Sequence, residues 1–226
     1  IRNLSRIAFG RATIRWSQLG FGRTSKTTAD QATPRNLFGY KDGTANLLAD
    51  DTAALDENVW VSAADGPAWL VGGSYLVARR IAMRIETWDR TRLAEQDRVV
   101  GRAKATGAPL SGGEELTAPD FAATGPTGAL RIDARSHVRL AHPDNNDGIR
   151  ILRRGYNFVD GTTDLGRLDA GLFFLSFQRS PQRYVTLQRS LSTDAMGEYL
   201  RHVGSGLWAV PPAAPAGASV GDALLS

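Results

Sequence analysis

The stretch that most constrains the fold is residues 74–88, where apolar and charged side chains alternate. Val77 and Ile81 fall on one parity and Arg80 on the other. Because successive side chains of a strand point to opposite faces, this period of two predicts a half-buried strand. Residues 171–177 form a nearly continuous apolar run of strand length. This run predicts a central strand that is buried on both faces.

Helical patterns are fewer. Asp89 is suited to cap a short helix over residues 90–100, with Leu93 facing inward. A second helix is predicted over residues 192–203, ended by Gly204.

Three stretches are predicted to be irregular, because they are rich in glycine, threonine, proline or alanine and lack periodicity: residues 21–46, 105–129 and 211–218. A loop as long as 21–46 in a compact protein is often functional. A segment over 11–19 is interpreted as a further strand that enters this loop. Strands joined by long loops, with few helices between them, favour an α+β fold over a doubly wound sheet.

Composition excludes several classes of protein. The 226 residues, 42% hydrophobic and 22% charged, are enough for a sizeable core in one large or two small domains. The chain has no cysteine, which excludes disulfides, thiolate metal ligands and iron–sulfur clusters. No apolar run approaches the ~18–20 residues that cross a bilayer. The 27 basic residues are interleaved with 23 acidic ones rather than gathered in a stripe, which argues against nucleic-acid binding.

The segment Gly39-Tyr40-Lys41-Asp42-Gly43-Thr44-Ala45-Asn46 carries the most specific chemistry. Asp42 stands between glycines, which allow the backbone to approach a ligand closely. A carboxylate held there is placed to act on something near the loop. The alternative for Asp42 alone is an Asx-turn in a glycine-flanked loop.

Histidine is scarce in the chain. The three are His137, His142 and His202, and His202 is interpreted as a surface residue late in its predicted helix. His137 and His142 lie in Ser136-His137-Val138-Arg139-Leu140-Ala141-His142-Pro143. That segment is followed by Ile151-Leu152-Arg153-Arg154-Gly155-Tyr156-Asn157-Phe158.

These three segments, in this order, resemble the dye-decolourising (DyP-type) haem peroxidases, whose signature is a GxxDG loop, a later haem-ligating histidine and an arginine after it. The resemblance runs over nearly the whole chain. It implies a ferredoxin-like antiparallel sheet of the dimeric α+β barrel type, with haem b as cofactor. It further implies hydrogen peroxide as oxidant and dyes, phenolics or similar compounds as one-electron donors.

The resemblance also implies site residues. His137 matches the proximal ligand of the haem iron, and His142 a position close to the haem; His142 as the ligand is the alternative. Asp42 and Arg153 match the distal acid–base group and the distal positive charge. Arg154 is the alternative to its neighbour.

Further positions follow from the same resemblance. Gly43, Thr44 and Ala45 fall in the cofactor-binding loop, and Leu172 and Phe174 match the apolar wall of the distal pocket. Plain core packing is the alternative for the last two.

A haem-ligating histidine usually donates its second ring N–H to a carboxylate or carbonyl. Asp194 is our candidate partner for His137, with a surface acid in a first helical turn as the alternative. The family motif often has phenylalanine where Tyr40 stands. This tyrosine could carry a radical or could simply be packed.

We expect the chain to be the C-terminal, haem-bearing part of a longer protein, because members of the family usually have a ferredoxin-like half before this point. Residues 1–20 would end that half and residues 21–226 would form the haem domain. An apolar sheet face should then be exposed where the preceding part packs, with the strand over 11–19 as the junction. The protein is expected to be secreted or periplasmic, with the cytoplasm as the alternative.

Two other functions stay open. Related proteins have been proposed to carry haem or release its iron, which is a binding role without peroxidase turnover. A haem-free structural module is the second alternative. Expected partners are peroxide, organic donors and the preceding part of the same protein, and a homo-oligomer is an open possibility.

Overall fold

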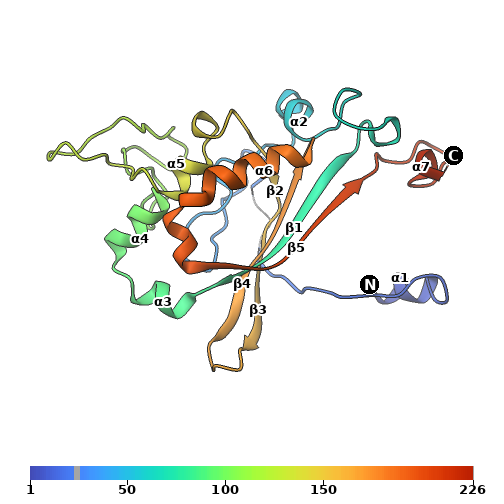
Figure 1. The fold of residues 1–226 in the computed structure, drawn as a ribbon, viewed down its shortest axis with the longest axis horizontal. Coiled ribbons are helices and arrows are strands. Elements are labelled where there is room, and N and C mark those ends of the chain that lie inside the picture. The colour runs from blue at the N-terminus through green and yellow to red at the C-terminus, as the bar shows by residue number, and fades with distance from the viewer. Residues whose placement is uncertain (23–25, 226) are drawn as a thin grey trace.

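The structure, a computed structural model, describes residues 1–22 and 26–225 and has the predicted α+β fold with an antiparallel sheet (Figure 1). Four strands follow the order β2-β4-β1-β5, and β3 also pairs with β4. The strands are β1 (Ser74–Met83), β2 (Leu152–Arg153), β3 (Tyr156–Thr162), β4 (Leu168–Gln178) and β5 (Leu200–Val210).

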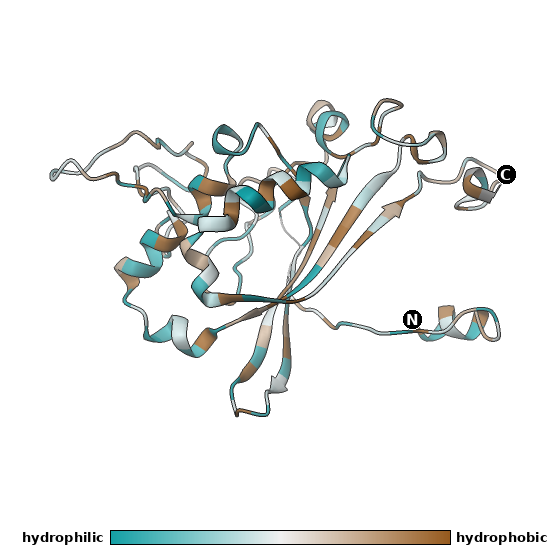
Figure 2. Ribbon diagram, in the orientation of Figure 1, coloured by the Kyte–Doolittle hydropathy of each residue, from teal (hydrophilic) through white to brown (hydrophobic). Residues whose placement is uncertain are grey.

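Helix α6 (Pro181–Ser190) lies across one face of the sheet, where Tyr184 packs on Phe174 of β4. Proline at its first position and the burial of Tyr184 and Leu187 explain where this helix starts and which side it buries. Figure 2 shows hydrophilic and hydrophobic residues alternating along it. The other α-helices are α1 (Arg2–Ile7), α2 (Thr52–Asn58), α3 (Ile85–Arg90), α4 (Leu93–Val100), α5 (His137–Ala141) and α7 (Asp222–Leu225). Short 3₁₀ helices are η1 (Ala68–Leu70), η2 (Pro143–Asn145), η3 (Leu191–Thr193) and η4 (Ala195–Tyr199).

Strand β1 confirms the predicted alternation over most of its length. Val77 and Ile81 are buried, whereas Arg80 on the opposite parity forms ion pairs with Asp160 at 2.8 Å and Asp169 at 3.0 Å. The two faces of the sheet therefore differ in kind. One face packs under helices, and the other carries a charged network.

The predicted strand over 74–88 is too long, because β1 ends at Met83. At this point the pairing with β4 has ended at Ala82 and the pairing with β5 ends at Met83. Without strand partners, the backbone satisfies its own hydrogen bonds in α3. Asp89 consequently lies inside α3 and is not the predicted cap.

The predicted orientation of Leu93 is also wrong, since this residue is 57% exposed at the start of α4. The buried residues of α4 are Gln96, Val99 and Val100. The side chain of Gln96 donates to the carbonyls of Trp88 (2.7 Å) and Thr91 (3.1 Å). These two bonds set which side of the helix faces the core.

Strand β4 is central, as predicted, because it pairs with β1 on one side and with β2 and β3 on the other. It is not buried on both faces. Residues 172–175 are only half-buried, since neither face of the sheet is fully covered there.

The predicted helix over 192–203 is wrong. Asp194 accepts a bond from the backbone N–H of Met196 and starts the short helix η4, after which the chain becomes β5. From Leu200 onward the chain pairs with β1, with one register shift opposite Arg80 and Ile81. Glycine and β-branched residues in this segment favour that outcome over a helix.

The predicted strand over 11–19 does not form either. This segment meets the sheet through side chains, with Trp16 edge-on to Phe173 at 6.4 Å, and Phe21 forms an isolated bridge with Asn157. Because this segment crosses a face of the sheet, its backbone does not lie beside the edge of a strand with which it could pair. Helix α1, which the sequence did not predict, precedes it without a side-chain cap (Figure 1).

The three stretches predicted as irregular contain no named helix or strand in their described residues. Trp16 (62%) and Trp208 (43%) remain well exposed and line one hollow with Phe173. The expected apolar face at a junction with a preceding part stays a prediction. The division at residue 20 stays a prediction. Within the described ranges, no helix combines the length and the apolar character needed to cross a membrane.

The core between the sheet and the loop at 34–46 depends on Trp88, which is fully buried. Replacing it with alanine should lower the free energy of unfolding by ~3–5 kcal/mol, because transfer and cavity costs add. Trp208→Ala, at a tryptophan that is 43% exposed, is the matched control and should cost much less. Urea denaturation measures both. Equal losses for the two variants would contradict this account of the core.

Candidate functional site

The loop at 34–42 is held in one shape by Asn36. Its side-chain oxygen accepts bonds from the backbone N–H groups of Phe38 (3.1 Å) and Tyr40 (3.3 Å), as in a local Asx-type turn. Gly39 takes the left-handed conformation at φ 83°, which glycine adopts without strain. Arg35 closes the turn from outside by donating to the carbonyls of Gly39 and Lys104, both at 2.6 Å.

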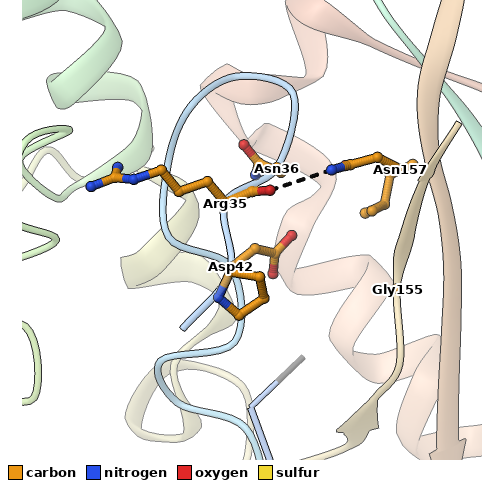
Figure 3. Close-up of a pocket in the computed structure, with 7 residues that line it drawn as sticks. Arg35, Asn36, Asp42, Gly155 and Asn157 are labelled. Carbon is orange, nitrogen blue, oxygen red and sulfur yellow. Dashed lines mark hydrogen bonds between the residues drawn. The ribbon is translucent and has the colours of Figure 1, made fainter. Parts of the chain in front are cut away.

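This turn delivers Asp42 to β2. The Nη1 of Arg153 donates to Oδ1 of Asp42 at 2.7 Å, and both side chains are half-buried. Figure 3 shows the carboxylate of Asp42 pointing into the space between its loop and the strand segment at Gly155 and Asn157. The structure thus pairs Arg153, and not its neighbour Arg154, with Asp42.

Asn46, at the end of the same motif, fastens this loop to β2. Its Oδ1 accepts the backbone N–H of Arg153 at 2.8 Å, and its Nδ2 donates to the carbonyls of Arg153 (3.1 Å) and Lys26 (3.0 Å). Asn46 is buried, so water cannot replace these bonds easily. The side chain of Asn46 therefore fixes the position of the Arg153 main chain relative to Asp42.

The second half of the site begins at α5, whose first residue is His137. Its Nδ1 lies 2.6 Å from Oδ2 of Asp194, the partnership that the sequence predicted. Two bonds bring the segments together: Ala195 N–H to the carbonyl of Arg135 at 3.0 Å, and Arg135 Nε to the carbonyl of Thr193 at 2.9 Å. Asp194 also caps η4, so one carboxylate serves both purposes.

The electrostatics of His137 connect the two halves. Burial of the imidazole opposes its charged form, but the charge and hydrogen bond of Asp194 outweigh this and raise the pKa of His137. Arg153 lowers and Asp42 raises the same pKa by smaller amounts. The imidazole therefore lies within electrostatic reach of the ion pair on β2.

His142, at the end of α5, is engaged elsewhere. Its Nδ1 accepts the backbone N–H of Asp144 at 3.3 Å, and its ring is edge-on to Phe121 at 5.0 Å. Asp144 binds the Nδ1 side of the ring. His142 and His137 are therefore not equivalent: only His137 has a buried carboxylate partner.

The three residues that follow Asp42 differ in burial and in their contacts. Gly43 is buried, the hydroxyl of Thr44 donates to Glu115 at 3.2 Å, and Ala45 is exposed. Glu115 in turn pairs with Lys41. These bonds tie the loop to residues 107–115 rather than directing its side chains toward His137.

Leu172 and Phe174 lie on the same face of β4, under the helices. Leu172 lines a pocket of about 20 Å³ beside Asp42, and it would lie 3.1 Å from a Cβ added to Gly155. Phe174 packs against the cluster of Ile149, Ile151 and Leu187. Both side chains are only half-buried, although they lie between the sheet and α6.

Two residues that organise the candidate site were not predicted from the sequence. Asn46 stands inside the recognised motif, and this position was the signal that could have drawn attention to it. Its bonds to both the N–H and the carbonyl of Arg153, however, depend on tertiary structure. Asp97, which accepts the phenolic hydrogen of Tyr40 at 2.5 Å, had no local signal at all.

With this geometry in place, comparisons with known proteins give a consistent answer. The family model described as "Dyp-type peroxidase, C-terminal" matches residues 33–215. A dye-decolorizing peroxidase of Thermobifida fusca is 43% identical over an alignment of 219 residues, and the match covers 94% of this chain and 51% of that protein. A deferrochelatase of Escherichia coli K12 is 39% identical with the same coverage. The chain thus spans about half the length of the curated relatives it matches.

Solved structures agree with this. An oxyferrous complex of DtpA from Streptomyces lividans superposes with a TM-score of 0.91 at 40% identity. A DyP-type peroxidase from Streptomyces coelicolor gives the same TM-score and identity. The superpositions cover 100% of this chain and 62% and 61% of those chains.

The hydrogen bonds from Asn46 to the main chain of Arg153, here called the clamp on β2, can be tested by measuring the stability of variants. Asn46→Ala should destabilise the protein, because each buried polar group left without a partner costs ~1–3 kcal/mol. Asn157→Ala is the control, since that amide makes one longer bond, 3.3 Å, to the carbonyl of Arg35. Urea unfolding of both variants is the measurement. A loss for Asn46→Ala no greater than that for the control would show that the clamp is not structural.

Proposed function

Because this chain belongs to the family of DyP-type peroxidases, we propose that it is the haem-bearing part of a peroxidase. The enzyme uses hydrogen peroxide to oxidise dyes, phenolics or similar donors in one-electron steps. The observation that carries the proposal is the pairing of two polar units. One is Asp42 with Arg153 on the loop and β2, and the other is His137 with Asp194 on α5 and η4.

The residues fit haem b. Asp194 occupies Nδ1 of His137, so Nε2 is the ring nitrogen left to bind iron, and the carboxylate fixes the ring and raises its basicity. His137 keeps 33% of its side-chain surface exposed although it lies among packed elements. The half-buried Leu172 and Phe174 offer an apolar surface that the core has not covered. A chain without cysteine cannot use a thiolate instead.

When bound, the haem iron would supply the position at which hydrogen peroxide binds and would take up its oxidising equivalents. The chain supplies the proton chemistry. Asp42 would accept a proton from one peroxide oxygen and return it to the other, as a general acid–base group. Arg153 orients that carboxylate through Nη1, and its fixed charge stabilises negative charge as the O–O bond breaks.

The remaining predicted residues have supporting roles in this proposal. Leu172 and Phe174 would form an apolar wall, which strengthens the fields of the charged pair. Gly43, Thr44 and Ala45 would shape the loop beside the cofactor. His142 would lie near its edge, where Nε2 is the ring nitrogen not used by Asp144.

A second candidate function is removal of iron from haem, because relatives named deferrochelatase are 39% identical over 94% of this chain. The same His137–Asp194 unit would hold haem in both cases. Incubating the whole protein with haemin and recording absorbance separates the alternatives. A Soret band with peroxide-dependent dye bleaching supports the peroxidase. Conversion of the haem spectrum to that of the fluorescent, metal-free porphyrin, with release of iron and no bleaching, supports the second function, and no band at any stage contradicts both.

The ligand assignment leads to a paired test. His137→Ala should abolish or greatly weaken haem retention, because the imidazole held by Asp194 is lost. His142→Ala should leave the Soret band largely in place. Titration with haemin, followed at the Soret band, measures both. Retention in the first variant and loss in the second would move the ligand to His142.

The distal roles lead to a kinetic test. Asp42→Asn and Arg153→Leu should keep the haem but slow the reaction with peroxide, since general acid–base help is typically worth ~10²–10⁴-fold. Stopped-flow absorbance after mixing with peroxide gives the rate constants. Asp160→Asn, an exposed acid on the charged network of Arg80, is the control and should be unchanged. Losses smaller than about tenfold in both distal variants would contradict the assigned roles.

A further inference from the structure

The buried Tyr40 and the half-buried Asp97 form a donor–acceptor pair near the site but outside its proposed proton chemistry. The phenolic hydroxyl of Tyr40, which is 3% exposed, donates to Oδ1 of Asp97 at 2.5 Å. The backbone N–H of Lys104 donates to the same oxygen at 2.9 Å. Asp97 is therefore held in place from a second direction.

From this geometry we propose that Tyr40 is a redox-active residue that gives one electron to the oxidised site while its phenolic proton passes to Asp97. This inference rests on the proposed peroxidase function, which supplies the oxidant through hydrogen peroxide. Tyr40 and Asp42 are two residues apart in one loop, so their Cα atoms are at most ~7 Å apart. The tyrosine is thus close to the group that would handle peroxide.

The step balances as follows. Tyr40 loses one electron and one proton and becomes a neutral phenoxyl radical. Its O–H bond breaks and an O–H bond forms on the Asp97 carboxylate. The site that peroxide has oxidised is reduced by the same electron. An electron from an organic donor, with return of the proton from Asp97, restores the tyrosine.

The surroundings of Tyr40 favour loss of an electron together with a proton over loss of an electron alone. The ammonium of Lys104 lies 5.6 Å from the centre of the Tyr40 ring. A positive charge there is attracted to a neutral ring and would be repelled by a ring that has become cationic. Burial, and then the hydrogen bond and charge of Asp97, raise the pKa of Tyr40, so the resting ring keeps its proton. Oxidation must therefore be coupled to transfer along the existing hydrogen bond.

Tyr40 also belongs to an aromatic cluster that reaches toward the other half of the site. Trp88 stacks on Phe38 at 4.3 Å, lies edge-on to Tyr199 at 4.8 Å and edge-on to Tyr40 at 6.0 Å. Val138, next to His137 in the chain, packs against this cluster.

Tyr40 differs from the other two oxidisable rings of the cluster, Trp88 and Tyr199, in its hydrogen-bond partner. The Nε1 of Trp88 donates to a backbone carbonyl, and the hydroxyl of Tyr199 lies 3.5 Å from the hydroxyl of Thr91. Neither of those partners is a carboxylate. Tyr40 is the member of the cluster whose hydrogen bond ends on a base able to keep the proton.

The test is electron paramagnetic resonance of the haem-loaded whole protein, frozen shortly after mixing with peroxide without a donor. The wild type should show a tyrosyl radical, identified by its change on ring-deuteration of tyrosine. Tyr40→Phe should lose this signal and Tyr199→Phe should keep it. Asp97→Asn should also lose it, because an amide can accept the hydrogen bond but cannot take the proton. The Soret band of each variant shows that the site is intact.

A tyrosyl signal that persists in Tyr40→Phe would overturn the inference, as would one that persists in Asp97→Asn. Absence of a tyrosyl signal in the wild type overturns it as well. Peroxide consumption and dye bleaching, measured in the same samples, test the proposed function separately. Bleaching without a signal that depends on Tyr40 would leave the peroxidase standing and remove the redox role of this tyrosine.

Discussion

The hydrogen bonds between Asn46 and the main chain of Arg153 are the constraint on which the candidate site depends. They join a glycine-containing loop to the two-residue strand β2, and the Asp42–Arg153 ion pair forms across that junction. An exposed ion pair alone would contribute little and would not fix its own geometry. Here the buried amide of Asn46 sets the distance between the loop and β2. The ion pair between Asp42 and Arg153 therefore forms at a junction that other bonds already stabilise.

The aromatic cluster extends this arrangement to the second half of the site. Phe38 and Tyr40 come from the loop that carries Asp42, and Met196 and Tyr199 come from the segment that follows Asp194. Trp88 fills the space between them and donates its ring N–H to the carbonyl of Phe38 at 3.1 Å. The loop and η4, far apart in sequence, consequently share one packed unit. This shared packing brings His137 close enough to the loop that the charge of Asp42 contributes, as a minor cause, to the raised pKa of His137.

Sequence reasoning could predict the α+β class, strands β1 and β4 and the long loops, because each rests on periodicity or composition. Asp194 was only a candidate partner for His137, with a surface acid as the alternative, and the structure decides for the pair. Residues 192–203, which include η4 and the start of β5, were predicted as a helix, since the local pattern does not reveal that β1 offers a free edge to residues from Leu200 onward. The end of β1 at Met83 was missed for the same reason, because its partner strands lie far away in the sequence. The orientation of Leu93 was missed because the nearby polar residue Gln96, which bonds the carbonyls of Trp88 and Thr91, faces the core instead. Asp97 lies 57 residues from Tyr40, and no spacing rule connects them.

The site has one more consequence, for the order of events during folding. The bond between Asp42 and Arg153 spans 111 residues, and that between His137 and Asp194 spans 57. Closing such long loops costs entropy that is recovered only after distant segments have met. A chain emerging from the ribosome therefore cannot form the Asp42–Arg153 pair until β2, made of residues 152–153, has docked against the loop at 34–46, and cannot form the His137–Asp194 pair until α5 and the start of η4 have met. Under the proposed function, capture of the cofactor by these pairs would be a late event that reports on completed folding, rather than a nucleus around which the chain collapses.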